Sequence, residues 1–197
     1  ELPEPSQAVL RAARALLRRK ERKATGRFLA EGPQAVREAL KVPNAVESVF
    51  FRWGAVHDHV DLLDAARADV PHYAVSEQNL ITVSDTVTPQ GVVAVCRTVD
   101  VALAEALADD PQLVVICAQI RDPGNAGTVI RCADAFGADA VILSSDSVEV
   151  YNPKTVRASV GSIFHLPRVE GVDLAEAIDA CPAAGLQVFA NDGESGT

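Results

Sequence analysis

One short segment of the sequence combines a turn, an amide side chain and an arginine at helical spacing. Its residues are Ile120-Arg121-Asp122-Pro123-Gly124-Asn125-Ala126-Gly127-Thr128-Val129-Ile130-Arg131. Pro123 and Gly124 favour a turn, and Gly127 lets a backbone or a ligand approach closely. Asn125 offers a carboxamide that donates and accepts hydrogen bonds, and Arg131 lies one helical turn past Gly127. These residue types predict a ligand-binding loop that leads into a helix.

The same segment lacks the signatures of two common nucleotide sites. It has neither the glycine spacing G-x-G-x-x-G of dinucleotide-binding folds nor the Lys-Ser/Thr pair of a P-loop. A purely structural interpretation also stays open. In it the segment is a well-formed turn, and Arg131 pairs with Asp122 or Asp134.

A dense cluster of basic residues lies near the N-terminus. Between residues 11 and 27 a single acid, Glu21, stands among Arg11, Arg14, Arg18, Arg19, Lys20, Arg22, Lys23 and Arg27. Such a cluster suits a phosphate backbone, because neutralised phosphates release counterions. The alternative is the solvated face of an amphipathic helix whose apolar side chains pack inward: Val9, Ala13, Leu16 and Leu17.

The net charge of −9 conceals an uneven distribution. Residues 1–60 contain 11 Lys and Arg against 7 Asp and Glu, whereas residues 61–197 contain 7 against 20. Any contact with nucleic acid is therefore expected to be local and to involve the N-terminal region.

Composition and cysteine usage exclude several protein classes. With 48% hydrophobic and 23% charged residues, the chain is neither disordered, collagen-like nor a coiled coil. No apolar run is long enough to span a membrane, and the N-terminus lacks the pattern of a signal peptide, so we expect a soluble, cytoplasmic protein. The histidines His57 and His59 have no further ligands nearby, and no metal site is predicted. The cysteines are expected to be small buried residues without disulfides: Cys96, Cys117, Cys132 and Cys181.

The elements that would position these residues fall into two α/β units. Residues 1–98 are predicted to form the first unit. Its helices are expected at 6–23, 32–40, 57–68 and 76–83, and its strands at 27–30, 45–51, 72–75 and 91–99.

A linker at 99–111 with an Ala-rich helix is predicted to lead into a second unit over residues 112–197. Extended segments at 113–120, 140–143, 163–169 and 186–190 alternate with helices at 128–136, 155–160 and 172–180. This alternation predicts a doubly wound parallel sheet, with the strand at 113–120 covered on both faces. The segment 121–127 would then lie at the carboxyl edge of the sheet, where open α/β folds bind ligands.

Four segments, in order along the chain, resemble the SpoU/TrmH branch of the SPOUT methyltransferases. The family's first motif matches Asp122-Pro123-Gly124-Asn125-x-Gly127-x-x-x-Arg131-x-Ala133-x-x-x-Gly137-Ala138. The segment after it matches Tyr151-Asn152-Pro153-Lys154-x-x-Arg157-Ala158-Ser159-x-Gly161. The opening and the closing strand of the family's ribosomal-protein-like RNA-binding domain resemble residues 26–32 and 88–94.

The resemblance implies a homodimeric, S-adenosylmethionine-dependent enzyme that methylates a ribose 2′-hydroxyl in ribosomal or transfer RNA. It also implies that Asn125 and Arg131 act near the target ribose. A guanidinium is an awkward base because its pKa exceeds about 12, so we favour a role in holding a phosphate and polarising the hydroxyl. The residues expected to bind RNA are Arg19, Arg22, Lys23, Arg27 and Arg157.

The family's second and third motifs build the cofactor pocket and a trefoil knot. The resemblance implies that the cofactor-binding residues lie beyond Thr197, so the second domain is expected to be incomplete and its knot absent from this chain. A non-catalytic RNA-binding protein without a cofactor site is the rival hypothesis. A third is a domain that binds a small anionic metabolite at 121–127.

Overall fold

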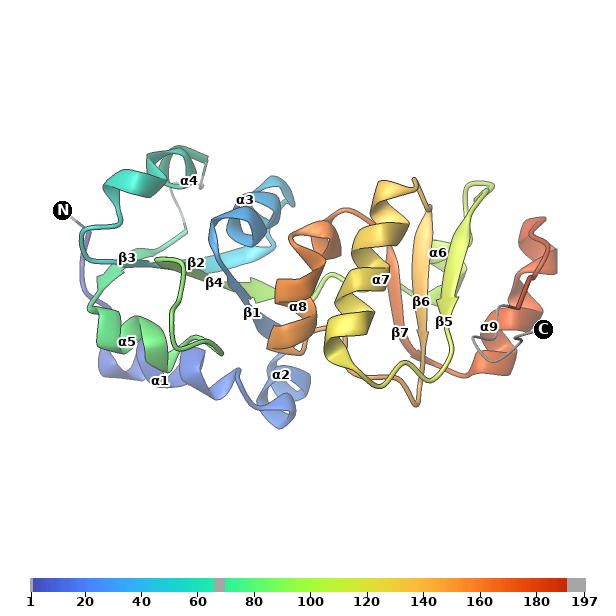
Figure 1. The fold of residues 1–197 in the computed structure, drawn as a ribbon, viewed down its shortest axis with the longest axis horizontal. Coiled ribbons are helices and arrows are strands. Elements are labelled where there is room, and N and C mark those ends of the chain that lie inside the picture. Colours follow the sequence, from blue (N-terminus) through green and yellow to red (C-terminus); the bar gives the residue numbers. More distant parts are fainter. Residues whose placement is uncertain (1, 66–69, 191–197) are drawn as a thin grey trace, which may run out of the picture.

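Two α/β units lie side by side along the long axis of the molecule, as a computed structural model shows (Figure 1). The structure describes residues 2–65 and 70–190. The N-terminal unit contains a four-stranded sheet of order β1-β4-β2-β3, and the C-terminal unit a three-stranded sheet of order β5-β6-β7. The second sheet is parallel throughout, so the predicted α/β class and parallel sheet are confirmed.

The N-terminal sheet is mixed. Its strands are β1 (Arg27–Glu31), β2 (Val46–Arg52), β3 (His72–Val75) and β4 (Val92–Arg97). Strand β4 runs antiparallel to both β1 and β2, whereas β2 and β3 are parallel. The helices of this unit are α1 (Gln7–Ala15), α2 (Arg19–Thr25), α3 (Pro33–Lys41), α4 (Val60–Ala65) and α5 (Glu77–Thr82), with a 3-10 turn η1 at His57–His59. Residues 66–68 of the expected helix 57–68 lie outside the described residues.

The single helix expected over residues 6–23 is wrong, because the chain leaves helical geometry at Arg18 and forms α1 and α2 instead. The carbonyl oxygens of Leu16 and Leu17 accept hydrogen bonds from Nη1 of Arg22, at 2.8 and 2.9 Å. The predicted break at Gly26 is confirmed, since this residue adopts φ +62° and ends α2.

Helices cover both faces of the C-terminal sheet. Its strands are β5 (Val114–Cys117), β6 (Ala140–Ser144) and β7 (Arg168–Val172). The helices are α6 (Leu103–Ala106), α7 (Pro123–Ala135), α8 (Pro153–Ser159) and α9 (Leu174–Ala180), with 3-10 turns η2 (Ser162–Phe164) and η3 (Pro182–Ala184). On β6, Val141 and Leu143 share a core with α7 and α8, whereas Ile142 packs with residues of α6 and α9. The doubly wound arrangement is therefore confirmed.

Four local expectations for the C-terminal unit are wrong. The extended segment expected at 163–169 begins as the 3-10 turn η2, and strand β7 starts only at Arg168. Helix α7 begins at Pro123 and not at residue 128, because the Asp122 side chain caps it. Residues 186–190 carry no regular structure, since no strand pairs with them and a strand exists only through such pairing. Strand β5 is only partly buried at three of its four residues, because it forms an edge of the sheet.

Helix α8 lies between the two units and joins their cores (Figure 1). The Phe28 ring of β1 lies 4.5 Å from the Tyr151 ring and 5.8 Å from the Phe164 ring, measured between centroids. The Tyr151 hydroxyl donates to Asp100 at 2.6 Å and accepts from the Val99 N–H at 2.7 Å. These contacts tie the linker and both units into one hydrophobic core.

Within the described part of the chain, none of the helices has the combined length and apolar character that a membrane span needs.

Candidate functional site

The first turn of α7 holds the predicted ligand-binding segment. The N–H of Asn125 donates to Oδ1 of Asp122 at 2.8 Å, and Lys154 of α8 lies 3.3 Å from Oδ2. The backbone hydrogen bond from Asn125 is the main cause that lowers the pKa of Asp122, and Lys154 adds to it. The Asn125 side chain is exposed, and its carboxamide has no hydrogen-bond partner within residues 2–65 and 70–190. The turn is therefore fixed by its own backbone, and the amide stays available to a ligand.

Gly127 brings the first motif against the second. A Cβ atom at this position would lie 2.5 Å from the Thr155 carbonyl oxygen and 2.6 Å from the Ala158 Cβ. The close approach that the glycine predicts is thus made by the backbone of α8. As a result α7, with Asn125 and Arg131, packs directly along α8.

Arg131 projects from α7 into solvent, and no acid among the described residues pairs with it. The two carboxylates considered as its partners are engaged elsewhere. Asp122 binds Lys154 at 3.3 Å, and Asp134 lies 2.6 Å from Nδ1 of His165. The structural interpretation of Arg131 as a helix residue held by an acid is therefore wrong, and its guanidinium is free to contact a substrate.

Arg157 bridges the two units. Its Nη1 lies 3.6 Å from Oε2 of Glu31 on β1, and its Nη2 lies 3.5 Å from Oδ2 of Asp85. Glu31 also accepts a short hydrogen bond from Thr86. Two carboxylates thus offset the charge of this arginine, which makes it a weaker anchor for phosphate than an unpaired side chain.

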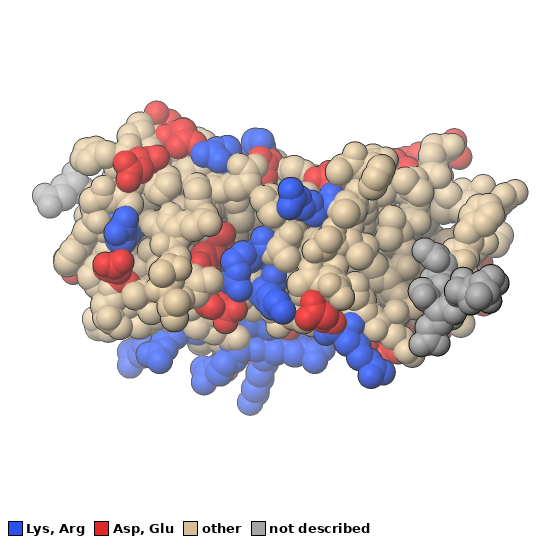
Figure 2. Space-filling model, viewed as in Figure 1, with Lys and Arg blue, Asp and Glu red and all other residues tan. Residues whose placement is uncertain are grey.

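Basic side chains gather along one edge of the molecule, over α1 and α2 (Figure 2). Arg19, Lys23 and Arg27 are exposed there. Arg19 lies 3.6 Å from Glu149, and Arg27 lies 2.6 Å from Glu47. Only Gly26 separates the end of α2 from Arg27, the first residue of β1, so the exposed basic residues of α2 lead directly to this strand.

Arg22 does not fit the RNA contact expected of it. Its side chain is 3% exposed and donates to both carboxylate oxygens of Glu149, itself 5% exposed, at 2.8 Å each. Its third nitrogen binds the carbonyl oxygens of Leu16 and Leu17. Four of its five N–H groups are engaged and the side chain is buried, so the structure corrects this assignment to a contact between the two units.

The cysteines follow the sequence expectation with one exception. Cys96, Cys117 and Cys181 are buried free thiols, whereas Cys132 is exposed because it lies on the solvent side of α7 beside Arg131. Burial raises the pKa of Cys117 to about 11. The described residues contain no cluster of three or more His, Cys, Asp or Glu side chains that could hold a metal ion.

A cavity beside the C-terminal sheet does not fit an adenosine-containing cofactor. It measures about 620 Å³ and runs along β5. Its side chains are mostly aliphatic, such as Leu113, Ile116 and Leu186, and its polar side chains are Gln112 and Gln187. Carboxylates that could bind a ribose diol are absent from its wall. The lining of this cavity therefore offers no partner for the polar groups of such a cofactor.

Two family profiles match this chain. The profile of the SpoU rRNA Methylase family matches residues 112–197. The profile of the MRM3-like substrate binding domain matches residues 8–94.

Similar curated proteins act on ribosomal RNA according to their names. The chain is 37% identical to the 23S rRNA (guanosine(2553)-2′-O)-methyltransferase RlmP of Bacillus subtilis, over 87% of this chain and 64% of that protein. It is 33% identical to the mitochondrial rRNA methyltransferase 3 of Xenopus laevis, over 85% of this chain and 40% of that protein. The chain thus spans less than two thirds of the length of these relatives.

Solved structures show the same fold. The SpoU methyltransferase AviRb of Streptomyces viridochromogenes superposes with a TM-score of 0.77 at 30% identity, over 91% of this chain and 67% of that chain. Its complex with the cofactor AdoMet gives a TM-score of 0.79 at 29% identity, over 90% of this chain and 68% of that chain.

Proposed function

The chain belongs to the SpoU rRNA methylase family, and from this premise we propose that it methylates a ribose 2′-hydroxyl of ribosomal RNA. The observation that carries the proposal is that α7, a helix fixed against α8, carries both the unpaired Arg131 and the free carboxamide of Asn125. These groups form a polar, substrate-facing surface in the segment that matches the family.

S-adenosylmethionine supplies an electrophilic methyl group, and we assign the described residues to the ribose side only. The 2′-hydroxyl must be oriented for in-line attack, and its proton must leave. Arg131 provides a permanent positive charge that holds a phosphate next to the hydroxyl and polarises it. Asn125 fixes the ribose through its carboxamide.

Ribosomal RNA is proposed over transfer RNA because the names of the similar proteins specify rRNA. We propose further that the protein is cytoplasmic, that it acts as a homodimer, and that its cofactor-binding residues lie outside the described part of the chain. The proposed phosphate contacts of the N-terminal unit are Arg19, Lys23 and Arg27. Arg157 of α8 contributes where this helix meets the N-terminal unit.

Methyl transfer to ribosomal RNA by the full-length protein tests the proposal. Arg131→Ala should lower kcat by about a hundredfold or more, as for the loss of other electrostatic groups in active sites. Binding of S-adenosylmethionine, measured by calorimetry, should change little. Arg37→Ala is the matched control, because Arg37 is an exposed arginine on α3 that pairs with Asp61. Equal loss of cofactor affinity in Arg131→Ala would assign the residue to the cofactor site instead.

A further inference from the structure

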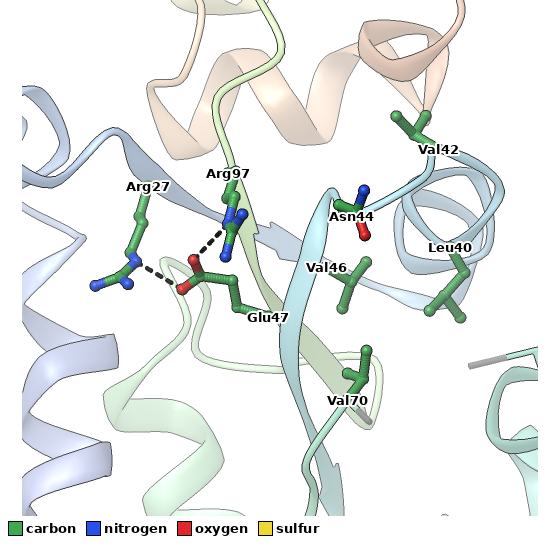
Figure 3. Close-up of a pocket in the computed structure, with 8 residues that line it drawn as sticks. All are labelled: Arg27, Leu40, Val42, Asn44, Val46, Glu47, Val70 and Arg97. Carbon is green, nitrogen blue, oxygen red and sulfur yellow. Dashed lines mark hydrogen bonds and ion pairs between the residues drawn. The ribbon is translucent and has the colours of Figure 1, made fainter. Parts of the chain in front are cut away.

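A cavity of about 360 Å³ opens at one end of the N-terminal sheet, on residues that the proposed reaction does not use (Figure 3). Its charged wall consists of Arg27, Arg97 and Glu47, from β1, β4 and β2. Its other wall is largely aliphatic. The volume falls in the range of about 300–1,000 Å³ that small ligands occupy in proteins.

The charged wall is a pair of arginines held by one carboxylate. Arg27 and Arg97 lie directly opposite each other in the register of β1 and β4. Two like charges at such positions repel each other, so the pair needs a counter-charge. The register of β2 and β4 shifts between Val46 and Ser48, which leaves Glu47 at an irregularity of the strand. Such irregularities redirect a side chain, and Glu47 reaches both arginines.

The geometry of these ion pairs leaves most donors of the arginines unused. Glu47 contacts each guanidinium at Nε, with Oε2 at 2.6 Å from Arg27 and Oε1 at 2.7 Å from Arg97 (Figure 3). Nη1 and Nη2 of both arginines have no partner among the residues that the structure describes. Two positive charges against one negative leave a net charge of about +1, with free donors in the planar arrangement that binds phosphate oxygens.

The aliphatic wall lies beside this arginine pair. Val46 is buried, and Leu40, Val42 and Val70 are partly buried and pack against the core of the unit. Figure 3 shows Val46 between the arginine pair on one side and Leu40 and Val70 on the other. The arginine pair suits a phosphate group, and the aliphatic wall suits a flat, weakly polar ring. A nucleotide contains both groups.

The pocket continues the basic edge of the molecule. Lys23 is exposed in the last turn of α2, and only residues 24–26 separate it from Arg27. An RNA strand whose phosphates bind the exposed arginines of α1 and α2 would reach the pocket at Arg27. Unpaired RNA bases are the ones that proteins can take out of the stack and enclose.

We propose that the pocket formed by Arg27, Arg97 and the neighbouring aliphatic side chains binds one unpaired nucleotide of the RNA substrate. The phosphate lies on the free Nη groups of the arginine pair, and the base lies against Val46, Leu40 and Val70. The inference rests on the proposed action on RNA. It adds that the N-terminal unit recognises a loop or bulge, in addition to the charge of the backbone.

Two variants of the full-length protein test the pocket from its two walls. Arg97→Ala removes phosphate donors, and Val70→Phe fills the cavity without changing charge. Arg52→Ala is the control, because Arg52 is an exposed arginine on β2 that pairs with Glu77. Binding is measured by fluorescence anisotropy on an RNA hairpin with an unpaired loop and on a fully paired duplex of equal length. Circular dichroism and thermal melting check that each variant is folded.

Both pocket variants should weaken hairpin binding by about tenfold, which corresponds to about 1.4 kcal/mol, and duplex binding should barely change. Arg97→Ala should also lower the slope of log affinity against log salt on the hairpin by about 0.7, whereas Val70→Phe should leave the slope unchanged.

If the pocket variants bind the hairpin as tightly as wild type, or lose equal affinity for hairpin and duplex, the pocket proposal is wrong while the proposed action on RNA stands. A wild-type protein that binds neither RNA would overturn both proposals. Tighter binding of free uridine or adenosine monophosphate than of the hairpin would make the pocket a site for small nucleotides, which also contradicts the proposal.

Discussion

Two of the charged contacts between the units of the chain differ in burial. In the Arg22 contact, Arg22 of α2 binds both oxygens of Glu149, and these side chains are 3% and 5% exposed. In the His165 contact, His165 lies 2.7 Å from Glu38 of α3 and 2.6 Å from Asp134 of α7. His165 is 40% exposed. Each contact joins an N-terminal helix to the C-terminal unit, but water reaches only the second one.

The difference in burial changes what each contact can do. A guanidinium is a permanent cation, and removal of one partner from a buried ion pair leaves a poorly compensated charge in the interior. An imidazole can change its charge near neutral pH, and water screens the pairs that His165 makes. The first contact is expected to hold the two units together throughout the physiological pH range, and the second to respond to pH within it.

Removal of the buried guanidinium should have the largest effect. Arg22→Ala leaves the buried carboxylate of Glu149 with only the exposed Arg19, 3.6 Å away, and we expect a loss of about 3–5 kcal/mol in the free energy of unfolding, measured with urea. Arg19→Ala is the matched control, because Arg19 lies 3.6 Å from the same carboxylate but is 60% exposed. The free energy of unfolding of Arg19→Ala should fall by about 1 kcal/mol or less.

A double replacement sharpens the same test. Arg22→Met combined with Glu149→Leu removes both charges and keeps apolar volume, so it should recover most of the stability that Arg22→Ala loses. If the double variant is as unstable as Arg22→Ala, the hydrogen bonds to the Leu16 and Leu17 carbonyls are the stabilising part of the contact and the ion pair is not.

A close backbone approach at the His165 contact should give the next largest effect. Gly161 has φ +90°, and a Cβ there would lie 2.7 Å from Cγ of Glu38. Gly161→Ala should therefore destabilise by about 2–3 kcal/mol, from the unfavourable backbone and from the displaced Glu38. Gly137→Ala is the control, since Gly137 has φ +73° and open space around its Cβ position. The free energy of unfolding of Gly137→Ala should fall only by the cost of the unfavourable backbone. An equal fall in Gly161→Ala and Gly137→Ala would mean that the Glu38 side chain moves away without cost.

The smallest effect is the pH dependence of the His165 contact. Burial opposes a charged His165, but the hydrogen bonds that its ring donates to Glu38 and Asp134, together with the charges of these carboxylates, outweigh burial and raise the pKa of His165. A raised pKa stabilises the fold below the unfolded value of about 6.5, and this stabilisation is lost as pH rises through the folded value. Lys41 and His165 lower the pKa of Glu38, which burial alone would raise, so its contribution is lost only in more acidic solution.

We therefore expect the difference in unfolding free energy between wild type and His165→Gln to be largest near pH 5–6.5 and to decrease towards pH 9, with a maximum of about 1 kcal/mol because the site is half-exposed. Urea titrations at a series of pH values measure it. A difference that stays constant with pH would show that His165 is held neutral. The charged and polar groups around the imidazole are Gln34, Glu38 and Lys41 of α3, Asp134 of α7 and Ser162 of η2.

Local sequence was sufficient for the features that depend on neighbouring residues. The motif around Asn125 predicted a turn that leads into a helix, and Asp122, Pro123 and Gly124 lie within a few residues of one another. Gly127 predicted a close approach, because only glycine allows one, whatever the approaching group is. The alternation of strand segments with helix segments along the chain predicted the parallel C-terminal sheet, because parallel strands need crossover connections.

Tertiary structure decided which charges face solvent and which strands find partners. In the sequence Arg22 is one more basic residue of a cluster, and its partner Glu149 lies 127 positions away. Arg131 is free because Lys154 and His165 take the acids that could have paired with it. Residues 186–190 have the composition of a strand, but pairing depends on a neighbour that no local pattern specifies. The sequence by itself determined the elements and their chemistry, and only the fold determined which side chains are left available, because availability depends on residues far away in the chain.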